Sequence, residues 1–147
     1  MSKFITALLV GMLITFIVDF FIFLGIKLNY IDFYEINLYY NILFADNQCF
    51  IIYFLSSFLL GYIVIYIQNK KLTLITLALV SIIGLSTLIE SVGQNVGKMM
   101  FMKKDVTYKD SKHTFHGDLY YNGRTTIHFY DNELQKMIIL QKKDLIK

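Results

Sequence analysis

The chain has 147 residues, of which 56% are hydrophobic and 17% are charged, and its formal net charge is +3. The length predicts a single domain, and the apolar share exceeds the roughly 45–50% that is usual for soluble domains. The net charge is too small and too dispersed to indicate a nucleic-acid partner. The single cysteine, Cys49, excludes an internal disulfide.

Charged residues are distributed unevenly along the chain. They are sparse up to Met102 and dense from Lys103 onward, which predicts a membrane domain at 1–102 and a small polar, β-rich tail at 103–147. Lysine greatly outnumbers arginine, and Ile, Phe, Tyr and Asn are frequent. Because these are the amino acids of A/T-rich codons, the composition indicates a bacterial source.

Three apolar segments, at about 4–28, 50–67 and 72–92, approach or exceed the roughly 20 helical residues that cross a bilayer core. The first is too long for a secretory signal, and no small-residue cleavage site follows it. The connection at 68–71 has room only for a tight turn, so the second and third segments form an antiparallel pair. The predicted fold class is a membrane all-α domain with three transmembrane helices, followed by a small C-terminal antiparallel β-hairpin or meander.

Residues 29–48, between the first two spans, are rich in Tyr, Phe and Ile. The helical spacing of four apolar positions predicts a short helix that lies in the membrane interface: Ile31, Tyr34, Leu38 and Ile42. A fourth full span is the competing interpretation. Asp32 and Glu35 disfavour it, because ionisable groups are costly inside a bilayer.

The distribution of lysines predicts the orientation of the chain. Lys3 lies at the N-terminus and Lys70 and Lys71 lie in the tight turn, whereas the loop after Lys27 holds three acids and no base. We therefore expect a multi-pass protein of the bacterial inner membrane, with the N-terminus in the cytoplasm and the C-terminal tail outside. The lysines at 98, 103 and 104 oppose this orientation.

The tail contains two β-branched and aromatic runs, at 114–121 and 124–130, separated by Asn122-Gly123. This pattern predicts a hairpin with a two-residue type I′ turn, since both residues tolerate positive φ. That register would pair His116 with Phe129 and Gly117 with His128. Residues 131–132 would form a second turn, and 133–140 could then supply a third strand or start a helix.

The predicted meander is too small for a self-sufficient core. We expect it to rest on the membrane surface, to pack on the end of the third helix, or to pair with another chain. In the predicted register His116 and His128 point to opposite faces of the sheet, which argues against a metal site with His113. We expect no metal and no cofactor.

Asp19 is the one acidic residue within the first apolar segment. A carboxylate in a membrane span costs about 3 kcal/mol on insertion scales. It could dock this helix onto another, carry protons or cations, or lie close to the interface. Polar residues on the other spans are its predicted partners: Ser56, Ser57, Ser81, Ser86, Thr87 and Glu90.

Small residues at four-residue spacing indicate helix-packing faces. Ser57 and Gly61 form one pair, and Gly93 and Gly97 form the other. They could pack within the monomer or form a homo-oligomer.

Glu90, Gln94 and Lys98 also recur every four residues and would share one helix face. This face is solvated if the third helix continues as an amphipathic extension from Glu90 toward Met102. The alternative is a polar site at the membrane surface, in which Glu90 and Gln94 act together with Asp19.

The chain contains no catalytic elbow, metal-binding or phosphate-binding motif. We therefore expect a non-enzymatic accessory or assembly subunit of a bacterial inner-membrane complex, in contact with the lipid bilayer and with a membrane protein partner or a second copy. A bacteriocin-type immunity protein and a small transporter or channel that uses Asp19 are the alternatives.

Overall fold

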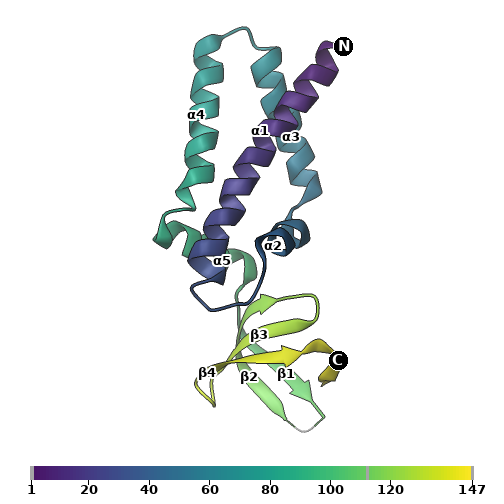
Figure 1. Ribbon diagram of the computed structural model, residues 1–147, viewed down its shortest axis with the longest axis vertical. Helices are drawn as coiled ribbons and strands as arrows, with labels where there is room; N and C mark the ends of the chain where they lie inside the picture. The colour runs from purple at the N-terminus through teal and green to yellow at the C-terminus, as the bar shows by residue number, and fades with distance from the viewer. Residues whose placement is uncertain (1, 112, 147) are drawn as a thin grey trace.

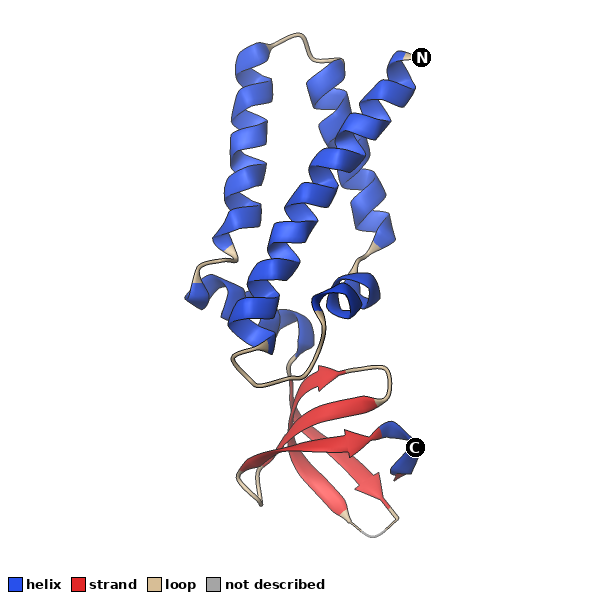
Figure 2. Ribbon diagram, in the orientation of Figure 1, coloured by secondary structure: helices blue, strands red, loops and turns tan. Residues whose placement is uncertain are grey.

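The computed structural model describes residues 2–111 and 113–146. A group of helices stands on a five-stranded antiparallel sheet, with the N-terminus and the α3–α4 turn at the end farthest from the sheet (Figure 1; Figure 2). The helical part contains α1 (Lys3–Ile26), a π-helical turn η1 (Lys27–Ile31), α2 (Tyr40–Asn47), α3 (Phe50–Ile65), α4 (Lys70–Ser86) and α5 (Glu90–Phe101).

One continuous helical segment in the described part of the chain is long and apolar enough to cross a membrane. It consists of α1 and η1 and covers 29 residues, Lys3–Ile31. Helix α2 joined to α3, and α4 joined to α5, would also be long and apolar enough. Each pair is bent, by 84° for α2–α3 and by 81° for α4–α5. By length and composition, the helices provide one span, or up to three if each bent pair is one span. The prediction of three spans is therefore not confirmed.

The third apolar segment, predicted at about 72–92, is not one continuous helix. Helix α4 ends at Ser86, and α5 begins at Glu90 in a different direction. The Thr87 hydroxyl lies 3.1 Å from the Phe21 carbonyl oxygen of α1 and 3.0 Å from that of Gly84. The backbone amides of Leu88 and Ile89 then donate to the carbonyls three residues earlier, instead of four as in an α-helix. The α-helix therefore ends where the Thr87 hydroxyl binds these carbonyls.

Within residues 29–48, the short helix begins later than the predicted positions Ile31 and Tyr34. Lys27 and Asp32 form an ion pair at the end of η1, and Glu35 has a left-handed backbone with φ 53°. This turn separates Ile31 and Tyr34 from the residues that follow, so the four predicted positions do not share one helix. The helix present is α2, which packs its aromatic side chains against the second half of α1.

The sheet has the strand order β4-β3-β2-β1-β5 and is antiparallel throughout. Its strands are β1 (Lys103–Asp110), β2 (Thr114–Asn122), β3 (Thr126–Asp131), β4 (Lys136–Gln141) and β5 (Leu145–Ile146). The meander of β2, β3 and β4 is confirmed, and the helical alternative at 133–140 is wrong. Strands β1 and β5 were not predicted.

The predicted type I′ turn at Asn122-Gly123 is wrong. Neither residue has a positive φ, and Asn122 pairs with Ile127 across a wider loop. Leu119 pairs with Phe129, a bulge follows, and Tyr121 pairs with His128. The predicted pairs of His116 with Phe129 and of Gly117 with His128 are therefore absent, and His116 pairs with Thr107 of β1 instead.

Helix α1 is the centre of the helical part. Helices α3 and α4 both pack against it and hardly touch each other, as the gap between them in Figure 1 suggests. At Gly61 of α3, a Cβ atom would collide with the Ala7 backbone of α1; at Gly11, it would collide with the Ser57 backbone of α3. The two helices thus approach backbone to backbone, as small residues allow in membrane proteins.

Candidate functional site

The four predicted helix-packing residues belong to α3 and α5, and within one copy of the chain they pack against α1 or η1. Ser57 and Gly61 face α1, as described above. Gly93 faces the Gly25 carbonyl and the Thr87 carbonyl, and Gly97 lies against the Tyr30 ring. Both small-residue pairs are therefore occupied by contacts within the monomer.

Asp19 accepts a hydrogen bond from Gln48, whose side-chain amide donates to the carboxylate over 3.0 Å. Gln48 lies between α2 and α3, so Asp19 lies where α3 begins and not halfway along that helix. Ser57, Ser86 and Thr87, which were among the predicted partners, donate to backbone carbonyls instead; Ser57 donates to Tyr53, and Ser86 donates to Ile83. Gln48 was missed because it stands outside the apolar runs.

Glu90 and Gln94 are not hydrogen-bonded to Asp19 in the described part of the chain. Both belong to α5, which carries Glu90 exposed and Gln94 and Lys98 partly exposed. The structure therefore does not assemble the predicted polar site of these residues with Asp19. Their spacing gives α5 an amphipathic surface, while its glycines face the protein.

The helices and the sheet meet at Tyr30, whose side chain is fully buried. Its hydroxyl donates to the Tyr120 carbonyl oxygen of β2 over 2.8 Å. Its ring packs against Phe101 of α5, and Phe101 in turn packs against Tyr121 of β2 at 5.3 Å between ring centroids. One apolar core thus continues from α1 and α2 into the sheet, so the sheet is fixed to the helices.

An ion pair closes the same junction at its edge. The Arg124 guanidinium, in the β2–β3 loop, binds the Asp46 carboxylate of α2 with both Nε and a terminal nitrogen; Nε lies 2.8 Å from Oδ2. This guanidinium holds the pKa of the Asp46 carboxyl below its usual range. We name the contact of Tyr30, Phe101, Tyr121 and this ion pair the helix–sheet junction.

A cavity of about 250 Å³ lies at the junction, between the 36–46 segment and the β2–β3 hairpin. Asp46, Arg124, Tyr121 and His128 contribute the ionisable groups of its lining. Within the described residues, no group of three His, Cys, Asp or Glu side chains is placed to hold a metal ion. The contacts of the junction hold the sheet against the helices, and polar side chains lie at its edge.

His128 is 7% exposed on β3, and burial lowers the pKa of its imidazole. A lowered folded-state pKa means that the unfolded chain binds a proton more readily, so the fold loses stability as the pH falls below about 6.5. We expect His128→Gln to flatten the pH dependence of thermal unfolding between pH 7 and pH 5. His116→Gln, at an exposed position of β2, is the matched control; equal slopes for the two variants would contradict this expectation.

No protein-family model, curated protein or solved structure matches the chain in comparisons with known proteins.

Proposed function

We propose that the protein is an integral membrane protein whose helices α1, α3 and α4 cross a bilayer. The support is the exposed apolar surface of these helices, which carries large side chains at 44–81% exposure: Phe4, Leu9, Leu13, Phe16, Ile51, Leu55, Leu59, Leu72, Leu74, Leu79, Ile82 and Ile83. A soluble monomer rarely exposes a contiguous apolar surface of this extent. The acyl chains of lipids would cover this apolar surface in a membrane.

The helix lengths agree with this proposal. The 24 residues of α1 extend over about 36 Å, and the 16 and 17 residues of α3 and α4 extend over about 24–26 Å. A bilayer core is about 30 Å thick, and tilting or local thinning absorbs differences of a few ångströms. Helices α2 and α5 turn away from this direction and would lie near the membrane surface (Figure 1).

We infer an orientation with the sheet outside the cytoplasm of a bacterial cell. The N-terminus and the α3–α4 turn lie at the end of the helices opposite the sheet (Figure 1). This end carries Lys3 at the start of α1 and Lys70 and Lys71 at the start of α4. Short loops rich in lysine remain on the cytoplasmic side. The inner membrane is the bacterial membrane that holds helical proteins of this kind.

The function we propose is that of a non-enzymatic accessory or assembly subunit, which presents its sheet to a larger membrane complex. The helix–sheet junction is the observation that carries this proposal. A sheet that only filled space would not require a fully buried tyrosine, a shared aromatic core and a paired arginine to hold it in one orientation. A fixed sheet can present one surface to a partner.

Strand β4 is the surface we assign to the partner. It is an edge strand, and Ile139 on it and Leu134 beside it are 60% and 54% exposed. An edge strand with exposed apolar side chains is a template for pairing with another chain. The opposite edge is covered in part by β5, which pairs with the end of β1.

Purification of the tagged full chain in a mild detergent, followed by mass spectrometry, tests the proposal. We expect a stoichiometric membrane protein to co-purify, and we expect Ile139→Asp to release it. Thr114→Asp, at an exposed position of β2, is the control and should retain the partner. A folded monomer with no co-purifying protein would overturn the proposal.

If the protein were a transporter, Asp19 would take up and release protons during transport. We expect that Asp19 does not carry protons across the membrane. The Asp19 carboxylate already accepts a hydrogen bond from Gln48, just before the first residue of α3. Liposomes that contain the wild-type chain should therefore conduct protons no faster than protein-free liposomes, and Asp19→Asn should not change this. A proton flux in the wild type that Asp19→Asn abolishes would favour the transporter.

A further inference from the structure

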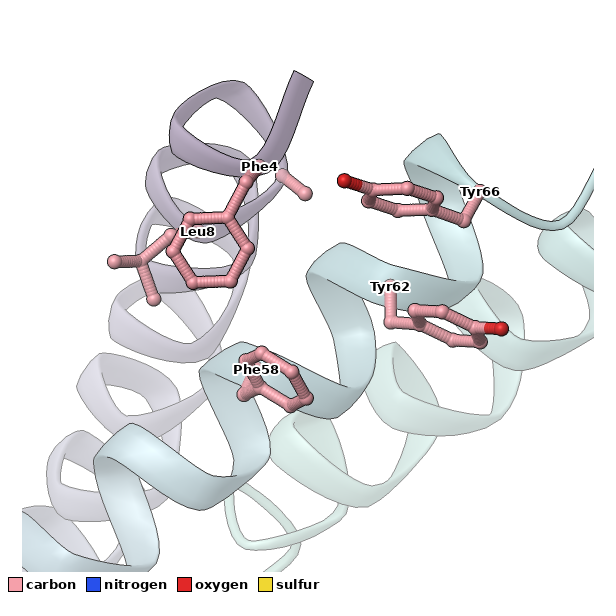
Figure 3. Close-up of a pocket in the computed structure, with 6 residues that line it drawn as sticks. Phe4, Leu8, Phe58, Tyr62 and Tyr66 are labelled. Carbon is pink, nitrogen blue, oxygen red and sulfur yellow. The ribbon is translucent and has the colours of Figure 1, made fainter. Parts of the chain in front are cut away.

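An apolar groove of about 210 Å³ lies between α1 and α3, near the N-terminus (Figure 3). Phe4, Ala7 and Leu8 line it from α1, and Phe58, Tyr62 and Tyr66 line it from α3. The Phe4 and Phe58 rings lie 6.2 Å apart between centroids, and Tyr62 and Tyr66 stack at 5.3 Å. The walls are therefore largely aromatic, and the groove suits a chain without polar groups.

Ala7, in the lining of the groove, lies where α1 and α3 approach each other backbone to backbone. Ala7 and Gly61 are in backbone contact, and neither has a side chain that could fill the space beside them. The larger side chains of Phe4, Phe58 and Tyr62 stand around this contact (Figure 3). The groove thus lies beside the small-residue packing of α1 and α3.

The mouth of the groove is cationic. The Lys3 ammonium lies 5.3 Å from the centre of the Tyr66 ring, which is itself part of the lining. Lys3 is exposed and forms no ion pair within the described residues. The mouth also lies at the N-terminus of α1, the positive end of the helix dipole. An apolar slot beneath an unpaired cation is complementary to an amphipathic molecule with an anionic head.

We propose that this groove binds one anionic phospholipid, with an acyl chain along the aromatic walls and the phosphate on Lys3. The proposal rests on the membrane insertion proposed above. Basic sites at the cytoplasmic ends of membrane helices recognise anionic headgroups, and the groove lies at the end that we assign to the cytoplasm. A partner helix would bury the Lys3 charge against apolar side chains, which is costly.

A second apolar groove provides an internal comparison. It lies between α1 and α4, has a volume of about 170 Å³ and is lined by Ile17, Val18, Phe21, Ser81, Gly84 and Leu85. None of the described residues in its lining is basic. A lipid in this second groove would be held by its chain alone, without preference for an anionic headgroup.

Native mass spectrometry of the full chain, with equal amounts of phosphatidylglycerol and phosphatidylcholine, tests the proposal. We expect one phosphatidylglycerol to be retained in preference, and Lys3→Gln to reduce this preference about fivefold. Phe58→Ala should reduce retention of the lipid itself. The matched controls are Lys71→Gln, at the start of α4 and at the same end of the molecule, and Phe54→Ala, one helical turn away on α3 with 51% exposure against 49% for Phe58.

Equal retention by Lys3→Gln and Lys71→Gln, or by Phe58→Ala and Phe54→Ala, would overturn the lipid site. A dimer that dissociates in Phe58→Ala would also overturn it, because the groove would then be an interface between copies. Circular dichroism establishes that each variant remains helical. Extraction with alkaline carbonate separates the two proposals: release of the wild type contradicts membrane insertion, whereas an inserted chain without lipid preference contradicts the lipid site alone.

Discussion

Replacing Gly61 with alanine is expected to lower the free energy of unfolding in detergent by about 2–3 kcal/mol. The added Cβ would collide with the Ala7 carbonyl group, and a backbone atom cannot rotate away as a side chain can. Helices α1 and α3 must then separate, and the contact between Gly11 and Ser57 one turn further along is weakened with them. Thermal unfolding, followed by helical circular dichroism, measures the loss.

Gly84→Ala is the matched control for this prediction. Gly84 also faces α1, but a Cβ there would lie 3.4 Å from the nearest atoms of Val18, which is an ordinary contact. Alanine is the better helix former by about 1 kcal/mol, so this variant should be as stable as the wild type or slightly more stable. An equal loss of stability in Gly84→Ala and Gly61→Ala would show that the close approach of α1 and α3 is not the cause.

Tyr30→Ala is expected to detach the sheet from the helices, at a cost of about 3–5 kcal/mol. It removes a fully buried ring that contacts Gly97 and Phe101, together with the hydrogen bond to the Tyr120 carbonyl. The start of β1, which follows α5 directly, should then open. Limited trypsin digestion measures this opening, because Lys103 and Lys104 lie in that segment.

Two variants separate the contributions of the Tyr30 ring and hydroxyl. Tyr30→Phe keeps the ring and should cost about 1 kcal/mol, the value of one hydrogen bond. Tyr39→Ala removes a tyrosine that is 72% exposed, and it should digest at the wild-type rate. If trypsin cut Tyr30→Ala no faster than Tyr39→Ala, the junction would not be what fixes the sheet.

Much of the secondary structure could be predicted from periodicity alone. The long apolar runs placed α1 and α3 within a few residues of their ends, because no polar residue competes for the backbone there. Strands β2, β3 and β4 followed from β-branched and aromatic runs. The break between α4 and α5 could not be predicted in this way. It depends on the hydrogen bond from Thr87 to a carbonyl of α1, 66 residues away in sequence.

The tertiary contacts of the candidate site escaped prediction for the same reason. Asp46 and Arg124 are 78 residues apart, and no local pattern relates them. Strand β1 is rich in lysine and has only two inward-facing apolar residues, Val106 and Tyr108, so its pairing with β2 is the clearest evidence for the strand. The hairpin register failed because the loop after Asn122 is wider than a type I′ turn, and the bulge after Leu119 shifts the pairing again.

Cysteine accessibility in intact cells tests the central claim that the helices cross a bilayer and hold the sheet on the far side from the lysine turn. The native Cys49 is exposed and is first replaced by serine. Single cysteines are then placed at Gln68, in the α3–α4 turn, and at Asn122, at the end of β2; both positions are exposed. Labelling with an impermeant maleimide should reach position 122 and should reach position 68 only after the membrane is opened. Equal labelling of both positions in intact cells would contradict the account.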